Sequence, residues 1–327
     1  MVQLVEPSRP AYYNLMAGGN MDVNLGAREV KLPDFMIVGA ARCATTSLHY
    51  YLNNYEGISI PLKEPWFFSY VNNPPGYSSP GAYDVIYEIE NYLSLYKNIP
   101  SGRLIGDASP SYLFTYDRTI RNIKEIYGSL YNNLKIIIIL RNPIERAYSH
   151  YMMHRRGYKE PLGFEEAIAP DTIAARHRDN WDIFYDYVGC GLYYAQVKAY
   201  IEEFPQVKVI LYDDLSREPR KALRGLCEFL NVDFREDVLL EKLNKSGVPR
   251  LEVLNKLING SSLFKDILMA VIPTPVRKRM KHKAYALNMK PVPISPSQKD
   301  YLHTFFARDI ENLSGLLNRD LSSWLNI

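Results

Sequence analysis

The sequence has few cysteines and no long apolar run. Its three cysteines, Cys43, Cys190 and Cys227, are an odd number and form no C-x-x-C pair, which argues against a disulfide framework and against a zinc site. No stretch approaches the roughly 18 consecutive apolar residues of a membrane-spanning helix, and no N-terminal segment resembles a signal peptide. We therefore expect a cytoplasmic protein in a reducing compartment.

The chain also has little excess charge of either sign. Its 39 Lys and Arg stand against 36 Asp and Glu, which gives a net charge of +3, far short of what a dedicated nucleic-acid-binding protein carries. We expect no nucleic-acid partner, and any anion site must be local. A basic run at 277–283 could meet anionic lipid or an acidic acceptor, although such runs are most often solvated faces. The sequence does not indicate an oligomeric state.

Short apolar runs alternate with helical segments after residue 30, and hydrophobic residues make up 47% of the chain. This order predicts a single α/β domain with a central, mainly parallel sheet of about five strands, flanked by helices. We expect the run 135–140 to be central, because a strand buried on both faces is continuously apolar. Residues 1–30 form an N-terminal extension and 31–327 the domain, which closes with a helix at 297–317. The other strands are predicted at 34–38, 57–60, 103–107 and 207–212.

The segment Gly39–Leu48 looks like a phosphate-binding loop that lacks its lysine. It follows a strand and opens a helix, an arrangement that aims backbone N–H groups and a helix dipole at an anion. In the pattern G-x-x-x-x-G-K-[ST], however, Ala44 takes the place of the second glycine and Thr45 that of the lysine. The only cation of the turn, Arg42, lies three positions earlier. The segment is therefore a poor triphosphate cradle, and an ordinary turn with a solvated Arg42 is the alternative.

A second anion site is predicted at the end of the strand 135–140. Pro143 marks a helix start, which puts Arg141 at the mouth of the sheet and Ser149 about two turns along the helix. A guanidinium and a hydroxyl in these places could grip a phosphate. The alternative is that Arg141 and Glu145 simply pair at the helix start. Ligands of open parallel sheets bind beyond the carboxyl ends of the strands, so this segment should meet Gly39–Leu48 in one crevice.

These segments together resemble sulfotransferases that use 3′-phosphoadenosine 5′-phosphosulfate, above all the bacterial and heparan-sulfate-type branch. The likeness covers nearly everything after residue 31, with its motifs in the same order. The motifs are Gly39–Leu48, Lys63–Phe68, Gly106–Tyr112, Leu140–Tyr151, Gly191–Tyr194, Leu211–Ser216, Asn244–Arg250 and Asp320–Trp324.

The resemblance implies a donor with a 5′-phosphosulfate and a 3′-phosphate, the product 3′-phosphoadenosine 5′-phosphate, and no metal. By this resemblance Arg141 and Ser149 hold the 3′-phosphate, and a late loop closes over the nucleotide. The residues implied for the 5′-phosphosulfate are Arg42, Cys43, Ala44, Thr45, Thr46 and Ser47, and those of the late loop are Lys245, Ser246, Gly247 and Arg250.

Two positions of the phosphate loop depart from the family pattern. Many members have Lys at the position of Arg42 and Gly at that of Ala44. Arginine keeps the charge without the reach of an ammonium. Alanine is acceptable at position 44 only with a right-handed backbone, since a positive φ is costly for it.

The implied chemistry is an in-line transfer of a sulfuryl group to a hydroxyl or amine of a glycan, lipid or small-molecule acceptor. The resemblance makes Glu64 the general base and gives Lys63 and Arg42 roles in stabilising charge. His150 is the alternative base, and with His154 it could also be read as half of a metal site, although no third ligand follows. The residues implied for the acceptor are Trp66, Phe67, Ser109 and Tyr112.

Two other function classes stay open on the residues alone. A nucleoside or sugar kinase is the enzyme alternative, disfavoured by Thr45 in place of the lysine, and a non-catalytic nucleotide-binding module is the third. The 26 tyrosines cluster between Tyr70 and Tyr96 and between Trp181 and Tyr194. Such clusters fill a core or line a pocket for a sugar or another flat molecule, and core filling is favoured for any single one.

Overall fold

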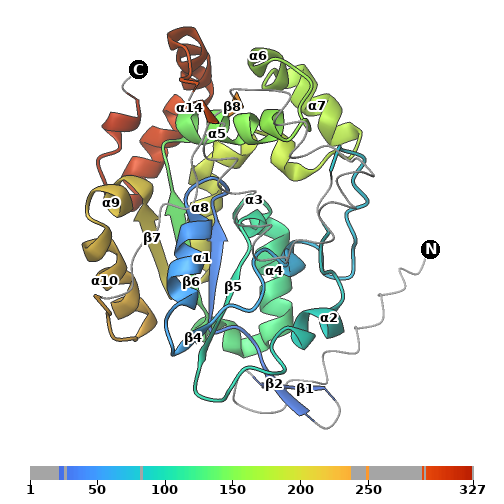
Figure 1. The fold of residues 1–327 in the computed structure, drawn as a ribbon, viewed down its shortest axis with the longest axis vertical. Helices are drawn as coiled ribbons and strands as arrows, with labels where there is room; N and C mark the ends of the chain where they lie inside the picture. Colours follow the sequence, from blue (N-terminus) through green and yellow to red (C-terminus); the bar gives the residue numbers. More distant parts are fainter. Residues whose placement is uncertain are drawn as a thin grey trace, which may run out of the picture.

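A five-stranded parallel sheet forms the centre of the molecule. The computed structural model describes residues 22–25, 28–81, 84–236, 248–249, 289–290 and 292–325. The strand order is β4-β5-β3-β6-β7, and every neighbouring pair runs parallel. The predicted α/β architecture is therefore confirmed (Figure 1). The strands are β3 (Phe35–Gly39), β4 (Ile58–Ser59), β5 (Leu104–Ala108), β6 (Lys135–Leu140) and β7 (Val207–Leu211).

The most apolar strand, β6, is an interior strand, as its composition predicts. It pairs with β3 on one side and with β7 on the other, and five of its six residues are buried. The middle position of the sheet belongs to β3, whose five residues are all buried. β-Branched and apolar side chains on both faces of these strands need cover on both faces, and this cover comes from the helices.

Helices cover both faces of the sheet. In Figure 1, α1 lies in front of the strands and α8 behind them, and α8 contacts α4 and α14. The helices are α1 (Thr45–Asn53), α2 (Ile89–Ser94), α3 (Ser111–Phe114), α4 (Tyr116–Tyr127), α5 (Pro143–Arg156), α6 (Phe164–Ala167), α7 (Pro170–Arg178), α8 (Tyr193–Glu203), α9 (Tyr212–Arg217), α10 (Pro219–Leu230) and α14 (Pro296–Leu317).

Local signals explain where α5 and α14, the two longest helices of the described residues, start. Asn142 accepts a hydrogen bond from the N–H of Ile144 at 2.9 Å, and Pro143 is the first residue of α5. Ser295 and Gln298 form a capping box at the start of α14, again with proline at the first position. Both helix starts lie within one residue of the positions predicted from the sequence.

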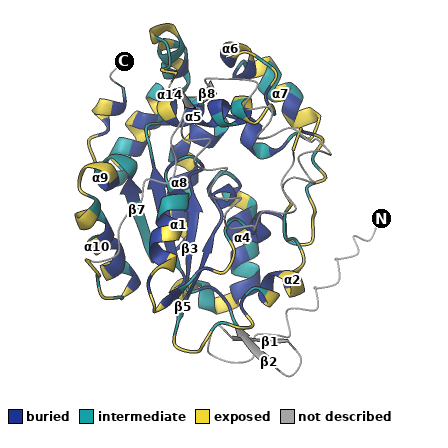
Figure 2. Ribbon diagram, in the orientation of Figure 1, coloured by how far each residue is buried: buried dark blue, intermediate teal, exposed yellow. Residues whose placement is uncertain are grey.

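Two small antiparallel pairs lie outside the main sheet. β1 (Asp22–Leu25) pairs with β2 (Arg28–Lys31) as a hairpin at the end of the predicted N-terminal extension, for which no strand was predicted. β8 (Val248–Pro249) pairs with β9 (Met289–Lys290). Within the described residues, no helix is both long enough and apolar enough to cross a membrane. Figure 2 shows that the buried residues concentrate in the sheet and on the helix faces turned toward it.

Candidate active site

The loop between β3 and α1 is strained and its helix end is open. Arg42 has φ 70° and Ala44 has φ 71°, both left-handed. The expectation that Ala44 has a right-handed backbone is therefore wrong, and the position that takes glycine in the family keeps glycine's conformation here. Ala44 gives α1 no side-chain cap, and the first turn contains no acidic residue. The first N–H groups of α1 thus lack side-chain capping, which suits an anion.

The side chain of Arg42 reaches across to α5. Its Nη2 lies 3.2 Å and its Nε 3.4 Å from Oγ of Ser149, and Nη1 lies 3.4 Å from Sδ of Met153. The resemblance assigned Arg42 to the 5′-phosphosulfate and Ser149 to the 3′-phosphate. The structure joins the two residues, which confirms that the ends of β3 and β6 meet in one place.

Four arginines gather around this contact. Burial, followed by the charges of Arg156, Arg141 and Arg146, lowers the pKa of Arg42 to about 10. Arg146 is completely buried, donates to the backbone oxygen of Tyr187 at 2.5 Å, and has no partner for its Nε. Within the described residues, no carboxylate pairs with Arg42 or Arg146. Cations held together without counter-ions favour an anionic ligand.

Arg141 has a carboxylate partner in this structure. Its Nε and Nη2 donate to Oε2 of Glu145 at 2.9 and 2.7 Å, and its guanidinium lies 5.0 Å from the ring centre of Tyr212. The helix-start pairing that the sequence left as an alternative is thus present. Glu145 is an exposed side chain, so Arg141 can exchange this contact for a phosphate at little desolvation cost.

The segment Lys63–Phe68 is the second strained loop at this edge of the sheet. The N–H of Glu64 donates to the backbone oxygen of Ala108 at 2.9 Å, which fixes the loop beside the end of β5. Glu64 and Trp66 both have left-handed backbones, with φ 63° and φ 60°. The ammonium of Lys63 contacts Oε1 of Glu64 directly, and both side chains are partly exposed. The predicted base is therefore accessible and carries a cation at its side.

A buried carboxylate supports this loop from below. Asp107 accepts hydrogen bonds from the hydroxyls of Tyr92 and Tyr112, both at 2.8 Å, and from Ser109 at 2.9 Å. Burial raises the pKa of Asp107 to about 6. Ser109 in turn accepts from the N–H of Trp66 at 3.1 Å. The network thus connects the segment Lys63–Phe68 to β5.

This network corrects the predicted acceptor contacts. Ser109 and Tyr112 are completely buried, with Tyr112 accepting from the N–H of Phe68 at 3.3 Å. Phe67 is also buried and stacks on Tyr92 at 4.2 Å between ring centres. These three side chains hold the loop and lie out of reach of an acceptor. Trp66 is 1% exposed and belongs to the wall behind the loop.

Three of the six histidines are enclosed near this edge of the sheet: the pair His150 and His154, and His49, which was not among the predicted site residues. His150 is a buried residue of α5, and burial followed by the charge of His154 lowers its pKa well below the ordinary value. His49 lies four residues after Thr45, one turn along α1, where burial and then the Lys63 charge lower its pKa. Its Nε2 is enclosed without a partner. The spacing to Thr45 was the available signal that His49 faces the site.

Cys43 is a further residue of the predicted phosphosulfate site. Cys43 is buried, and its N–H donates to Ala40 at 3.2 Å, so this N–H already has a partner within the turn. Within the described part of the chain, no three His, Cys, Asp or Glu side chains gather as metal ligands. The late loop and the basic run 277–283 lie outside the described residues, the former comprising Lys245, Ser246, Gly247 and Arg250.

Comparison with known proteins gives a consistent result. Residues 32–251 match the family model described as a sulfotransferase domain. The crystal structure of a sulfotransferase from Alicyclobacillus acidocaldarius superposes with a TM-score of 0.68 at 30% sequence identity, and the match covers 91% of this chain and 100% of that one.

Two further relatives have lower identity. The membrane-associated sulfotransferase kil1 of Dictyostelium discoideum is 23% identical over an alignment 376 residues long. This alignment covers 90% of this chain and 67% of that protein. The human bifunctional heparan sulfate N-deacetylase/N-sulfotransferase 2 is 24% identical over 216 residues, which cover 62% of this chain and 22% of that protein. This chain therefore spans only part of the length of either relative.

Proposed function

The chain belongs to the sulfotransferase family and is an enzyme of sulfuryl transfer, and from this premise we propose that its donor is 3′-phosphoadenosine 5′-phosphosulfate. One observation carries the proposal. The uncapped start of α1 lies beside two cations, Arg42 and Arg146, that have no carboxylate partner within the described residues. A donor with two separate anionic groups supplies the negative charge that this arrangement lacks.

The residues present fit such a donor better than a triphosphate. Thr45 stands where a nucleotide triphosphatase has the lysine that bridges two phosphates. The cations lie instead between the β3 loop and α5, where Arg42 meets Ser149. In the proposed complex the open end of α1 and Arg42 hold the 5′-phosphosulfate, while Arg141 and Ser149 hold the 3′-phosphate.

Glu64 is the proposed general base. Its carboxylate takes the proton of the acceptor hydroxyl or amine, while the acceptor atom forms its bond to sulfur and the bond from sulfur to the phosphate oxygen breaks. Lys63 beside it stabilises the negative charge that develops on that oxygen. Positioning and charge stabilisation supply most of the rate in this kind of transfer. His150 is less suited, because it is enclosed.

The donor assignment is tested by ligand-induced thermal stabilisation. The product, 3′-phosphoadenosine 5′-phosphate, should raise the melting temperature, and at 100 times its dissociation constant it should add about 2.7 kcal/mol of stability. ATP with magnesium should give much less. Equal stabilisation by both nucleotides would contradict the assignment. Arg178→Ala, an exposed arginine of α7, is the matched variant that should keep the full response.

A further inference from the structure

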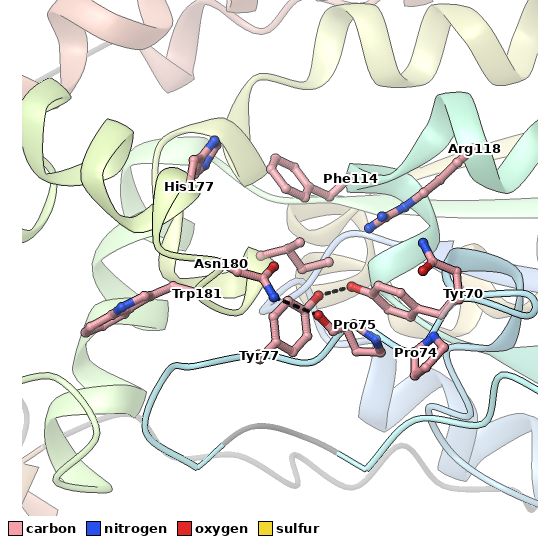
Figure 3. A pocket seen from close by; sticks show the side chains of 11 residues that line it. Tyr70, Pro74, Pro75, Tyr77, Phe114, Arg118, His177, Asn180 and Trp181 are labelled. Carbon is pink, nitrogen blue, oxygen red and sulfur yellow. Dashed lines mark hydrogen bonds between the residues drawn. The ribbon is translucent and has the colours of Figure 1, made fainter.

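A cavity of about 280 Å³ lies behind the loop that carries Glu64. Four of its eleven lining residues have aromatic side chains, Tyr70, Tyr77, Phe114 and Trp181 (Figure 3), and polar side chains line much of the rest. Its volume is just below the usual range of small-molecule sites, about 300–1,000 Å³. The space therefore suits one or two rings.

The cavity wall is continuous with both strained loops of the active site. Tyr70 stacks on Trp66 with 6.4 Å between ring centres, and Trp66 lies two residues after the proposed base. Trp66 and Tyr70 belong to one buried cluster with Ala41 of the phosphate loop, and Tyr77 packs against that cluster. One aromatic layer, Trp66, thus connects the cavity wall to the loop that carries the proposed base.

Arg118 brings an uncompensated charge to this aromatic space. It comes from α4 and extends toward Tyr70 and Tyr77 (Figure 3), with its guanidinium 4.6 Å from the Tyr70 ring centre. Its Nε is enclosed without a hydrogen-bond partner, and no carboxylate of the described residues pairs with it. The buried Asp182 carboxyl forms no ion pair with Arg118: its Oδ1 accepts from the N–H of Phe184 at 2.9 Å, and its Oδ2 has no hydrogen-bond partner.

Two polar side chains on the opposite side of the cavity already have partners of their own. His177 lines that side and pairs with Asp186 at 3.2 Å. Asn180 is held by the backbone oxygens of Pro75 and Gly76 at 2.8 and 2.9 Å. Arg118 thus has no ion-pair partner among the described residues that line the cavity.

We propose that this cavity binds the acceptor, and that the acceptor combines a flat or sugar ring with a carboxylate. The aromatic walls stack on the ring, and the guanidinium holds the carboxylate through a charge-assisted, two-pronged contact. Two sources share this chemistry, an aromatic acid and a uronic acid. The inference rests on the proposed function, because it makes the cavity part of the sulfuryl-transfer site.

The test compares acid and neutral members of two matched pairs of probes. One pair is 4-hydroxybenzoate and 4-hydroxybenzamide, and the other is 4-nitrophenyl glucuronide and 4-nitrophenyl glucoside. Calorimetry on the full chain measures the dissociation constant of each probe without any donor. The acid of at least one pair should bind about 10-fold or more tightly than its neutral partner. The pair that shows the preference identifies the source of the ring.

Variants of α4 attribute the preference to Arg118. Arg118→Gln should bring the acid-to-neutral ratio close to one, whereas Arg118→Lys should keep part of it. Arg121→Gln removes an exposed charge from the same helix and should leave the ratio unchanged. Melting temperatures of all three variants show whether the fold is retained.

Several outcomes would overturn the inference. These are no preference for either acid in the wild type, an unchanged preference in Arg118→Gln, or an equal loss in Arg121→Gln. Stabilisation by 3′-phosphoadenosine 5′-phosphate is measured on the same samples and should survive Arg118→Gln. If the wild type fails to bind this nucleotide, the donor assignment falls, while the probe ratios still judge the cavity.

Discussion

Replacing Ala44 with glycine should stabilise the folded chain, although glycine normally weakens the start of a helix. Ala44 has φ 71° and ψ 19°, a left-handed conformation, which costs an L-residue about 1–2 kcal/mol. Glycine removes this cost. It also raises the conformational entropy of the unfolded chain, which lowers the free energy of unfolding by about 0.4–1 kcal/mol. Ala44 is half-buried, so the loss of its methyl group lowers the free energy of unfolding by roughly another few tenths of a kcal/mol. The net gain should be about 0.5 kcal/mol.

Ala41 of the same loop provides the matched control. It is buried and is not among the left-handed residues. Ala41→Gly should therefore destabilise the chain by about 1–1.5 kcal/mol, from unfolded-state entropy and the loss of a buried methyl. The two substitutions should differ by roughly 1.5–2 kcal/mol, nearly all of which reports the left-handed backbone.

Urea unfolding followed by tryptophan fluorescence measures both variants. The midpoints should move in opposite directions, with the slope of free energy against urea unchanged. If Ala44→Gly loses as much stability as Ala41→Gly, the left-handed conformation of Ala44 is wrong, and with it the account of the open helix end.

Three further predictions concern the base, the second anion site and the buried carboxylate. Glu64→Gln should lower turnover about 10²–10⁴-fold and leave binding of 3′-phosphoadenosine 5′-phosphate almost unchanged; near-normal turnover would reject Glu64 as the base. Arg141→Ala should weaken that nucleotide by about 1.5–3 kcal/mol but hardly affect adenosine 5′-phosphate in calorimetry, and equal losses would make Arg141 structural. Burial raises the pKa of Asp107 from an ordinary 3.8 to about 6, so its contribution to stability is present below pH 4 and is lost as the pH rises through 6. Relative to Asp107→Asn, the wild type should lose about 3 kcal/mol of unfolding free energy in all, between a pH well below 4 and a pH well above 6, and parallel pH curves would contradict the burial argument.

The main sheet could be predicted because the apolar runs of its strands are visible in the local sequence. The run of isoleucines in β6 needs burial on both faces, and the proline before α5 marks a helix start, so neither depends on distant contacts. The hairpin of β1 and β2 had no such pattern, because two four-residue strands give too few positions for a period to appear. The convergence of the loops followed from the rule that parallel strands present their carboxyl ends at one edge.

The polar residues of the site were harder to assign. Ser109 and Tyr112 follow a strand end, which is where ligand-binding side chains stand, yet both are used by the buried Asp107. A buried carboxylate near the end of an apolar strand needs hydrogen-bond donors from its surroundings. The aspartate of β5 was therefore the signal that these hydroxyls support the loop rather than the acceptor.

The phosphate loop and the segment Lys63–Phe68 share a backbone feature that the sequence does not reveal. Each has two left-handed residues separated by one other, Arg42 and Ala44 in the first and Glu64 and Trp66 in the second. None of the four is glycine, so each conformation costs of order 1–3 kcal/mol and persists only where the surroundings impose it. For the second loop the surroundings include the bond from Trp66 to Ser109. Asp107 holds Ser109 in turn, so the buried carboxylate is coupled to the conformation that presents the proposed base. Loss of the Asp107 network should therefore disturb Glu64 before it disturbs the sheet, because the bonds of β5 to β3 do not pass through these hydroxyls.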